Sequence, residues 1–354
     1  MRKIKLLSIL IFVIFIINGC SNIINISENI RVNTDNTVHF IDVGQGDSIL
    51  VASDGEYMLV DAGEEDKGDD VVNYIRSLGI SNLKYVVATH PHSDHIGGMD
   101  DVINAFEVEN IIMPDTVTST KCFENLLDAV EAKKVNSIEA VFGNSFELGD
   151  FKCKILGPVN ISDEQNNNSV VIKLNYNNDS ILLTGDCSKE EERDIINTGV
   201  DISADLLKAG HHGSSTSSTE NFIENIKPSS AVISCGKNND YGHPHKRTMD
   251  TFEKNNIKIY RTDTDGTIIA DCSGSGITIR TNNGTYDVEN VNDDNGNLPS
   301  GEKTYILNIK SKKYHKIDCG GARNISDANK NEFTGTIEEL KEEGYSPCGI
   351  CKPE

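Results

Sequence analysis

The fold is decided by Thr89-His90-Pro91-His92-Ser93-Asp94-His95, a stretch that gathers three histidines and one aspartate within six residues. It directly follows the apolar run Tyr85-Val86-Val87-Ala88, which is typical of a buried β-strand. Imidazole and carboxylate groups are ligands that suit zinc and manganese. We therefore expect these four side chains to bind metal at the carboxyl end of a strand.

Outward from this stretch, short β-rich runs alternate with amphipathic helical segments. We predict strands at residues 38–43, 48–52, 57–60, 85–88, 110–113, 151–156, 170–174, 181–183, 231–234, 257–260, 267–270 and 277–280. We predict helices at residues 69–77, 99–106, 123–133 and 189–197. Strands in runs with interspersed helices indicate a layered α/β architecture, in which helices cover sheets.

The metal-ligating stretch, followed by Ile96-Gly97-Gly98, resembles the His-x-His-x-Asp-His signature of the metallo-β-lactamase superfamily. Three further motifs match that superfamily in the same order: Leu59-Val60-Asp61-Ala62-Gly63, Leu182-Leu183-Thr184-Gly185-Asp186 and Lys208-Ala209-Gly210-His211-His212-Gly213-Ser214. The resemblance covers residues 37–280 and implies a four-layer αββα hydrolase domain.

The resemblance also implies two divalent metal ions, Zn²⁺ or Mn²⁺. The first ion would be held by His90, His92 and a bridging Asp186. The second would be held by Asp94, His95, Asp186 and either His211 or His212. The usual third histidine of the first site is missing, since no histidine occurs from residue 96 to 185, and we expect Asn168 or a neighbour there. A single-metal enzyme, or a binding protein with a degenerate site, is the alternative.

A narrower resemblance links the chain to the extracellular hydrolase domain of the ComEC competence protein family. It rests on four strings: His39-Phe40-Ile41-Asp42-Val43-Gly44-Gln45-Gly46-Asp47-Ser48, Asn166-Asn167-Asn168-Ser169-Val170-Val171, His211-His212-Gly213-Ser214 and Tyr241-Gly242-His243-Pro244-His245. It implies a DNase that cleaves phosphodiester bonds with a metal-activated hydroxide. A role in DNA uptake does not carry over, because the resemblance is to that one domain.

Further roles follow from the same resemblance. Asp61 and Asp94 would orient ligands and water, and His243 or His245 would hydrogen-bond the phosphate or protonate the leaving oxygen. The candidate substrate contacts are Asp47, Asn168, Ser169 and Ser214. Plain turns remain the alternative for His243-Pro244-His245, for residues 44–47 and for the asparagine triplet, because Pro, Gly and Asn are common turn formers.

The formal net charge of −22 limits the class of partner. Such a chain repels polyanions at long range, which counts against a DNA-coating protein and makes a nucleic-acid substrate dependent on bound metal cations and local basic patches. A small phosphodiester, or a wall-linked ester such as a phosphorylcholine ester or a lactone, is the alternative substrate, since one fold hosts many reactions. No nucleotide cofactor is expected.

The first twenty residues resemble a bacterial lipoprotein signal. Arg2 and Lys3 precede an apolar run over residues 6–17, and Gly19-Cys20 follows. We expect lipidation at Cys20, a tether over residues 21–36 and an extracytoplasmic, membrane-anchored protein. A spanning anchor is the alternative, although the apolar run is shorter than the roughly 20 residues that a span needs.

A small C-terminal module is predicted after a polar linker at residues 281–303. Residues 304–354 contain His315, Cys319, Cys348 and Cys351, a ligand set for one structural Zn²⁺ ion. The end of the chain resembles the zinc-binding module of the Ada DNA-repair protein, although His315 departs from it, so we infer no methyl-acceptor chemistry. A disulfide or redox pair is the alternative. Nearby lysines would give the module a basic edge.

Overall fold

The computed structural model describes residues 36–281, 284–288, 303–316, 319, 322, 325, 329–335, 340, 345–348 and 351. The chain divides into two compact units, residues 1–291 and 292–354, which are described separately. No helix within the described ranges is long and apolar enough to cross a membrane. The predicted signal, the lipidated Cys20 and the tether as far as residue 35 lie outside the described residues.

The first unit contains a nine-stranded mixed sheet. Its strands, in spatial order, are β16 (Gly284–Val288), β15 (Ile277–Thr281), β14 (Ile268–Cys272), β1 (Thr37–Phe40), β2 (Ile49–Ser53), β3 (Glu56–Val60), β4 (Asn82–Val87), β5 (Glu107–Met113) and β6 (Asn136–Glu139). Strands β3 to β6 are parallel, and the others pair antiparallel. Because β16 pairs with β15, the sheet extends past the predicted domain end at residue 280.

A seven-stranded sheet packs against the first one. Its strands, in spatial order, are β13 (Lys258–Arg261), β12 (Ser230–Ile233), β11 (Leu206–Lys208), β10 (Asp179–Leu183), β9 (Val171–Tyr176), β8 (Phe151–Gly157) and β7 (Ser145–Leu148). Strands β10 to β13 are parallel. Both sheets therefore contain a parallel group whose carboxyl ends are followed by loops.

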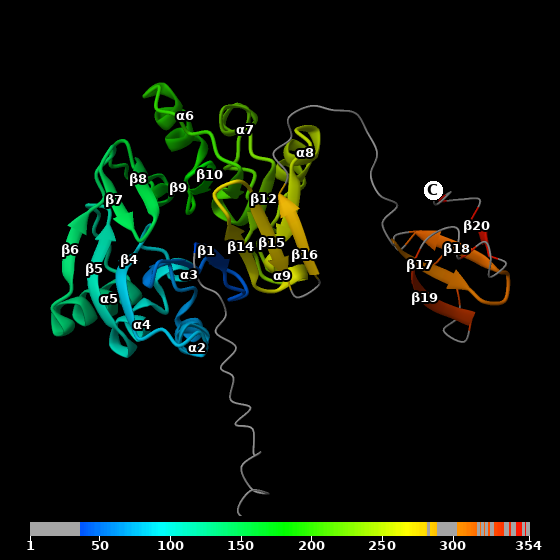
Figure 1. The fold of residues 1–354 in the computed structure, drawn as a ribbon, viewed down its shortest axis with the longest axis horizontal. Helices are drawn as coiled ribbons and strands as arrows, with labels where there is room; N and C mark the ends of the chain where they lie inside the picture. Colours follow the sequence, from blue (N-terminus) through cyan, green and yellow to red (C-terminus); the bar gives the residue numbers. More distant parts are fainter. Residues whose placement is uncertain are drawn as a thin grey trace, which may run out of the picture. The chain divides into compact units, whose positions relative to one another are not determined.

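Helices cover the outer face of each sheet (Figure 1). The first sheet is covered by α2 (Gly68–Ser77), α4 (Met99–Ala105) and α5 (Lys121–Lys133). The second is covered by α6 (Lys189–Asn197), α7 (Glu220–Ile226) and α8 (Lys246–Lys254). The short helices are η1 (Glu65–Lys67), α3 (Ser93–Ile96), η2 (Gln165–Asn168), η3 (Gly210–Gly213) and α9 (Thr262–Asp265). The four-layer αββα fold predicted from the sequence is confirmed.

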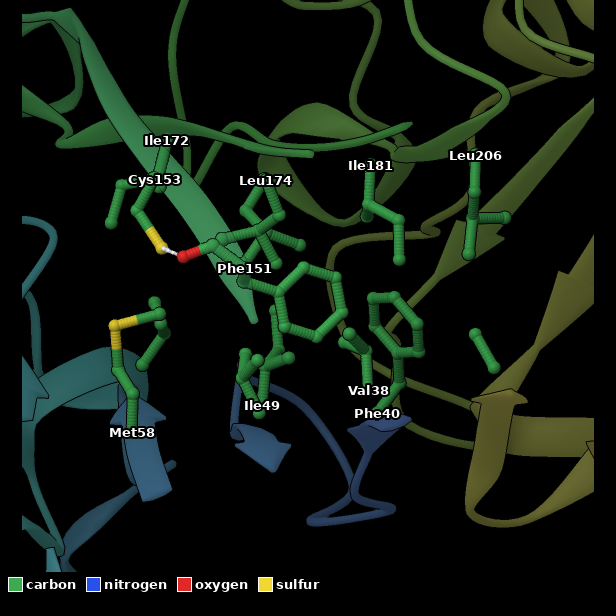
Figure 2. Packing of buried hydrophobic residues seen from close by; sticks show 14 of the residues in the cluster. Val38, Phe40, Ile49, Met58, Phe151, Cys153, Ile172, Leu174, Ile181 and Leu206 are labelled. Carbon is green, nitrogen blue, oxygen red and sulfur yellow. Dashed lines mark hydrogen bonds between the residues drawn. The ribbon is translucent and has the colours of Figure 1, made fainter. Parts of the chain in front are cut away.

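The alternation of side chains along β2 shows why the sheets form the inner two layers. Ile49 and Val51 point into the core between the sheets, whereas Leu50 points toward the helices. Figure 2 shows Phe151 and Leu174 of the second sheet facing residues of β1 to β3. A fully buried side chain of this size contributes roughly 1.5–3 kcal/mol to folding, so this core holds the loops of both sheets in a fixed relation.

The second unit contains a four-stranded sheet. Its order is β19 (Lys330–Gly335), β17 (Lys303–Asn308), β18 (Lys313–Lys316) and β20 (Ser346–Pro347). Tyr305, Leu307, Tyr314, Leu340 and Tyr345 form a small apolar cluster in this unit. So small a core rarely suffices alone, and such modules usually need a metal or a covalent link.

Candidate metal centre

The metal-ligating stretch spans the loop after β4 and continues into α3, which contains Asp94 and His95. Asp61, directly after β3, contacts this stretch. The Asp61 carboxylate accepts hydrogen bonds from the backbone N–H and from the hydroxyl of Thr89, at 2.9 and 2.7 Å. Its Oδ2 also lies 2.7 Å from His95 Nδ1. A proton on Nδ1 would leave Nε2 of His95 free to face a metal ion, a contact that fits the orienting role expected for Asp61.

Asp186, at the end of β10, presents its two carboxylate oxygens to two groups of histidines. Oδ1 lies 3.2 Å from His95 Nε2 and 3.5 Å from His212 Nε2. Oδ2 lies 3.9 Å from His90 Nε2 and 3.6 Å from His211 Nε2. One carboxylate is thus shared between two clusters of ligand atoms, the arrangement predicted for a bridging aspartate.

The inner half of the site consists of Asp94, His95, His212 and Oδ1 of Asp186. Asp94 Oδ2 lies 3.1 Å from His212 Nε2, and the ligand atoms of all four residues lie within 4.8 Å of one another. His95 and His212 are buried. Burial lowers the pKa of His212, but Asp186, Asp47 and Asp94 outweigh burial and raise it to about 10. The carboxylates therefore create a negative potential that suits a cation.

The outer half consists of His90, His92, His211 and Oδ2 of Asp186. His90 Nε2 lies 3.0 Å from His92 Nδ1, and His92 is exposed. Nδ1 of His211 lies 3.1 Å from the Thr216 hydroxyl, which leaves its Nε2 directed at Asp186. His211 Nε2 and His90 Nε2 thus face the same oxygen of Asp186.

The backbone conformation of η3 explains how two adjacent histidines serve different halves. His211 has φ 51° and His212 has φ 53°, both in the left-handed region that non-glycine residues rarely adopt. Such residues cost about 1–3 kcal/mol each and persist where the surroundings hold them. The next residue, Gly213, has φ 81°, and a Cβ there would lie 2.6 Å from Cβ of Pro244.

A buried ion pair between Lys208 and Asp47 lies next to His212 of the inner half. Lys208 Nζ lies 2.8 Å from Asp47 Oδ2, and Asp47 Oδ1 lies 3.3 Å from His212 Nδ1. Burial alone would raise the pKa of Asp47, but Lys208 and His212 outweigh it and lower the pKa to about 2. Gly46 lets this loop approach, because a Cβ there would lie 2.3 Å from the Asp94 carbonyl oxygen. Residues 44–47 therefore place Asp47 beside Lys208 and His212 in addition to turning the chain.

The four predicted substrate contacts lie outside the lining of the cavity over the metal centre. Asp47 faces Lys208 instead, and the Asn168 amide exchanges two hydrogen bonds with the Ser162 backbone. The Ser169 hydroxyl accepts from the Asp186 N–H and lies 3.4 Å from His90 Nδ1. Ser214 is also buried. These contacts fit roles in positioning the ligand loops.

The predicted acid–base histidines differ in their surroundings. Nδ1 of His245 accepts from the Ser215 N–H, and its Nε2 lies 3.1 Å from the Tyr241 carbonyl oxygen, so both ring nitrogens have backbone partners. His243 lines the cavity, and its Nδ1 is buried without a hydrogen-bond partner among the described residues. Burial, followed by His212 and His211, lowers the pKa of His243 to about 4. A neutral ring fits the hydrogen-bonding role better than the acid role.

The cavity has a volume of about 590 Å³. Part of its lining consists of residues given roles from the sequence: His92, Asp94, Asp186, His211, His212 and His243. The rest of the lining was given no role: Gln45, Glu65, Pro91, Ser93, Thr120, Lys121, Cys122 and Tyr241. Lys208 and Thr89 were also missed. A lysine that ends the apolar strand Leu206–Lys208 was an available signal, because buried lysines are rare unless paired.

The donor set fits divalent metal ions. His95 Nε2 and Asp186 Oδ1 are buried and have no hydrogen-bond partner in the described part of the chain. Such atoms are costly unless something satisfies them. Three imidazoles and a carboxylate on the outer half, and two imidazoles and two carboxylates on the inner half, are ligand types that zinc and manganese accept.

A second ligand cluster lies in the C-terminal unit. The ligand atoms of His315, Cys319, Cys348 and Cys351 lie within 4.8 Å of one another, with 3.5 Å between Cys319 Sγ and His315 Nδ1. All eight cysteines in the described part of the chain are free thiols. The predicted Cys₃His set is therefore brought together as a group suited to one metal ion, and its resemblance to the Ada module stays a prediction.

Comparison with known proteins places the first unit in a family. The family model of the Metallo-beta-lactamase superfamily matches residues 41–237. ComE operon protein 3 of Bacillus subtilis is 32% identical over 256 residues, which are 67% of this chain and 33% of that protein. Recombination protein 2 of Haemophilus influenzae is 27% identical over 237 residues, covering 65% of this chain and 28% of that protein.

Competence protein ComA of Neisseria gonorrhoeae is 27% identical over 232 residues, covering 64% of this chain and 31% of that protein. The chain spans about a third or less of the length of these relatives. The predicted relationship to the ComEC family is confirmed as a distant homology, at 27–32% sequence identity. With its fold, its buried His/Asp cluster and the family match, the chain belongs to the metallo-β-lactamase superfamily.

Proposed function

We propose that the chain hydrolyses phosphodiester bonds of nucleic acids with two divalent metal ions. The observation that carries this proposal is Asp186, whose two oxygens face two separate histidine groups. Paired metals stabilise the attacking and leaving oxygens of an in-line displacement at phosphorus. The relatives add support, because two are named for competence or recombination, processes that handle DNA.

In this proposal the outer half holds one ion and the inner half the other, with Asp186 as the bridge. Bound ions would supply Lewis acidity for the phosphate oxygens and lower the pKa of the attacking water. His211 raises the nitrogen count of the outer half to three, which favours Zn²⁺ over Mn²⁺ relative to the set expected from the sequence.

The chain's own residues position these groups and the substrate. Asp61 orients His95, while the Ser234 carbonyl oxygen, together with Asp47 and its partner Lys208, orients His212. His243 lines the cavity and offers a ring N–H to a phosphate oxygen. Because the cavity lining includes Glu65 and two carboxylate ligands, phosphate binding depends on the metals rather than on a basic surface.

We propose that the protein is a lipid-anchored, extracytoplasmic lipoprotein whose anchor is attached at Cys20. The apolar run followed by Gly19-Cys20 supports this. A Cys20→Ser variant expressed in a bacterial host would move from the membrane fraction to the soluble extracytoplasmic fraction or remain unprocessed. Unchanged membrane attachment of the processed variant would count against lipidation.

We propose that His315, Cys319, Cys348 and Cys351 hold one structural Zn²⁺ ion. Three thiolates and one imidazole form a closed tetrahedral set, which suits zinc in a structural role. A bound ion would explain why these four side chains gather in one place, and it would stabilise a unit whose apolar core is small.

The test uses residues 21–354, purified without chelator and supplied with Mn²⁺ or Zn²⁺. Single-stranded DNA, linear duplex DNA and a chromogenic phosphodiester are the substrates, and an Asp94→Ala, His95→Ala variant is the control. DNA cleavage that disappears in the control supports the proposal. Cleavage of the chromogenic ester with intact DNA would instead favour a small or wall-linked ester, which the acidic cavity lining also permits.

A further inference from the structure

Tyr241 lies at the edge of the cavity and is exposed to solvent. Its side chain lines the cavity, and the residue is 63% exposed. The ring stacks on His243, with 5.6 Å between ring centroids and 18° between planes. The His243 ring lies 5.6 Å from that of His211 and 6.1 Å from that of His212. A row of aromatic rings thus runs from the proposed ligands His211 and His212 through His243 to the exposed Tyr241.

Hydrogen bonds hold this loop in one conformation. The Asn239 amide donates to the carbonyl oxygens of Gly236 and His243 and accepts from the His243 N–H. His245 Nε2 lies 3.1 Å from the carbonyl oxygen of Tyr241 itself. A single exposed aromatic side chain is ordinary on a protein surface, but this one sits on a braced loop beside the proposed metal ligands. Such preorganisation lowers the entropic cost of binding.

The charge of the cavity limits what else could hold a polyanionic strand there. Glu65, Asp94 and Asp186 contribute carboxylates to the lining. Lys121 is the single Lys or Arg among the described lining residues, and it lies 3.5 Å from Glu124. Contacts to phosphate through basic side chains are therefore scarce, so a contact to another part of the nucleotide gains importance.

We infer that Tyr241 is a stacking platform for a nucleobase, and that the site consequently takes nucleotides whose base is unpaired or terminal. The inference rests on the proposed function, because the phosphate next to that base would lie at the metal centre. Every base has a π-face, so stacking on tyrosine is tolerant of sequence. Bases inside a duplex have both faces covered by their neighbours, which excludes them from Tyr241 until the duplex frays.

The test measures binding separately from cleavage. The metal-loaded full chain is titrated calorimetrically with thymidine 5′-monophosphate, which contains no phosphodiester, and with 2-deoxyribose 5-phosphate, which lacks the base. Wild type should bind the nucleotide roughly 5- to 100-fold more tightly. Tyr241→Phe should keep this ratio and Tyr241→Ala should lose most of it, with melting temperatures confirming that both variants fold.

Cleavage of a single strand and of a blunt duplex of the same sequence forms the second arm. Wild type should prefer the single strand, and Tyr241→Ala should reduce that preference. An equal nucleotide-to-sugar ratio in wild type and Tyr241→Ala would overturn the stacking platform, even if DNA is cleaved. A ratio that depends on Tyr241 without cleavage of any strand would retain the platform and overturn the proposed hydrolysis.

Discussion

The inner and outer halves of the metal centre share Asp186 but differ in how firmly their other ligands are held. In the inner half, Asp61 holds Nδ1 of His95, while Nδ1 of His212 lies 3.1 Å from the Ser234 carbonyl oxygen and 3.3 Å from Asp47, which pairs with Lys208. The histidine, aspartate and lysine side chains of this set are buried. In the outer half, His92 is exposed and His211 is fixed through the hydroxyl of Thr216.

From this difference we expect metal affinity to depend on how firmly the ligands are held as well as on their type. The outer half has three imidazoles and the inner half has two. The histidines of the inner half, however, have more buried side-chain partners that hold them in place. Partners that orient ligands change metal affinity by roughly 10- to 100-fold. We therefore expect the inner half to bind its ion more tightly than the outer half.

The largest effect should come from removing the shared ligand. Asp186→Ala takes one ligand from each half, so both ions should be lost and turnover should fall by roughly 10³-fold or more. Metal content by mass spectrometry and cleavage rates measure this, with Asp250→Ala, an exposed aspartate on α8, as the matched control. An active Asp186→Ala variant would refute the bridging role.

The adjacent histidines offer the sharpest test of the comparison. His212→Ala should remove the tightly bound ion, whereas His211→Ala should leave it and weaken only the second binding step. Stepwise titration of each variant with Zn²⁺ separates the two outcomes. The account fails here if the two substitutions give the same binding isotherm.

Breaking the buried pair beneath the inner half should have a smaller effect on activity. Lys208→Met leaves the Asp47 carboxylate buried without its partner, which costs about 3–5 kcal/mol of folding stability. It should also weaken the tight ion by roughly 10- to 100-fold. Thermal unfolding and metal titration report the two effects.

The double variant Asp47→Asn, Lys208→Met is the control for this pair, because removing both charges avoids the unpaired carboxylate. It should recover much of the stability but not the full metal affinity. A single Lys208→Met variant as stable as wild type would mean that the pair does not support the site.

The smallest effect on the hydrolytic reaction should come from the C-terminal cluster. Cys348→Ser should release the zinc of that unit and leave cleavage of a small chromogenic phosphodiester within about twofold, since the cluster belongs to a separate compact unit. Cys272→Ala, which removes a thiol outside both the cluster and the cavity lining, is the matched control. Loss of both zinc and small-substrate cleavage would show that the two units depend on each other.

Much of the fold could be predicted from periodicity. The strands near residues 49–53, 56–60 and 181–183 and the helices α2 and α5 follow clear apolar patterns. Helix α8 was missed because Thr248 and Phe252 are its only buried residues, too few for a periodic signal. Strand β16 was missed because its sequence reads as a polar linker.

The sequence predicted which candidate ligands come together, but not how they are arranged. Neighbouring histidines look equivalent in a sequence, and only the left-handed backbone of His211 and His212 directs them to different halves. Asp47 follows the glycine-containing loop Gly44-Gln45-Gly46, and we predicted a substrate contact for it on that basis. Its partner Lys208 lies far along the chain, so the ion pair that turns it inward depends on tertiary structure.

The central claim is that Asp186 joins two unequal metal sites that act together on a phosphodiester. The most direct measurement titrates metal-free residues 21–354 with Zn²⁺ or Mn²⁺ while following both binding and cleavage of a single-stranded oligonucleotide. We predict two binding steps of different affinity beyond the C-terminal zinc, with cleavage appearing only during the weaker step. Full cleavage after the first ion, or a hydrolase unit that binds one ion or none, would contradict the account.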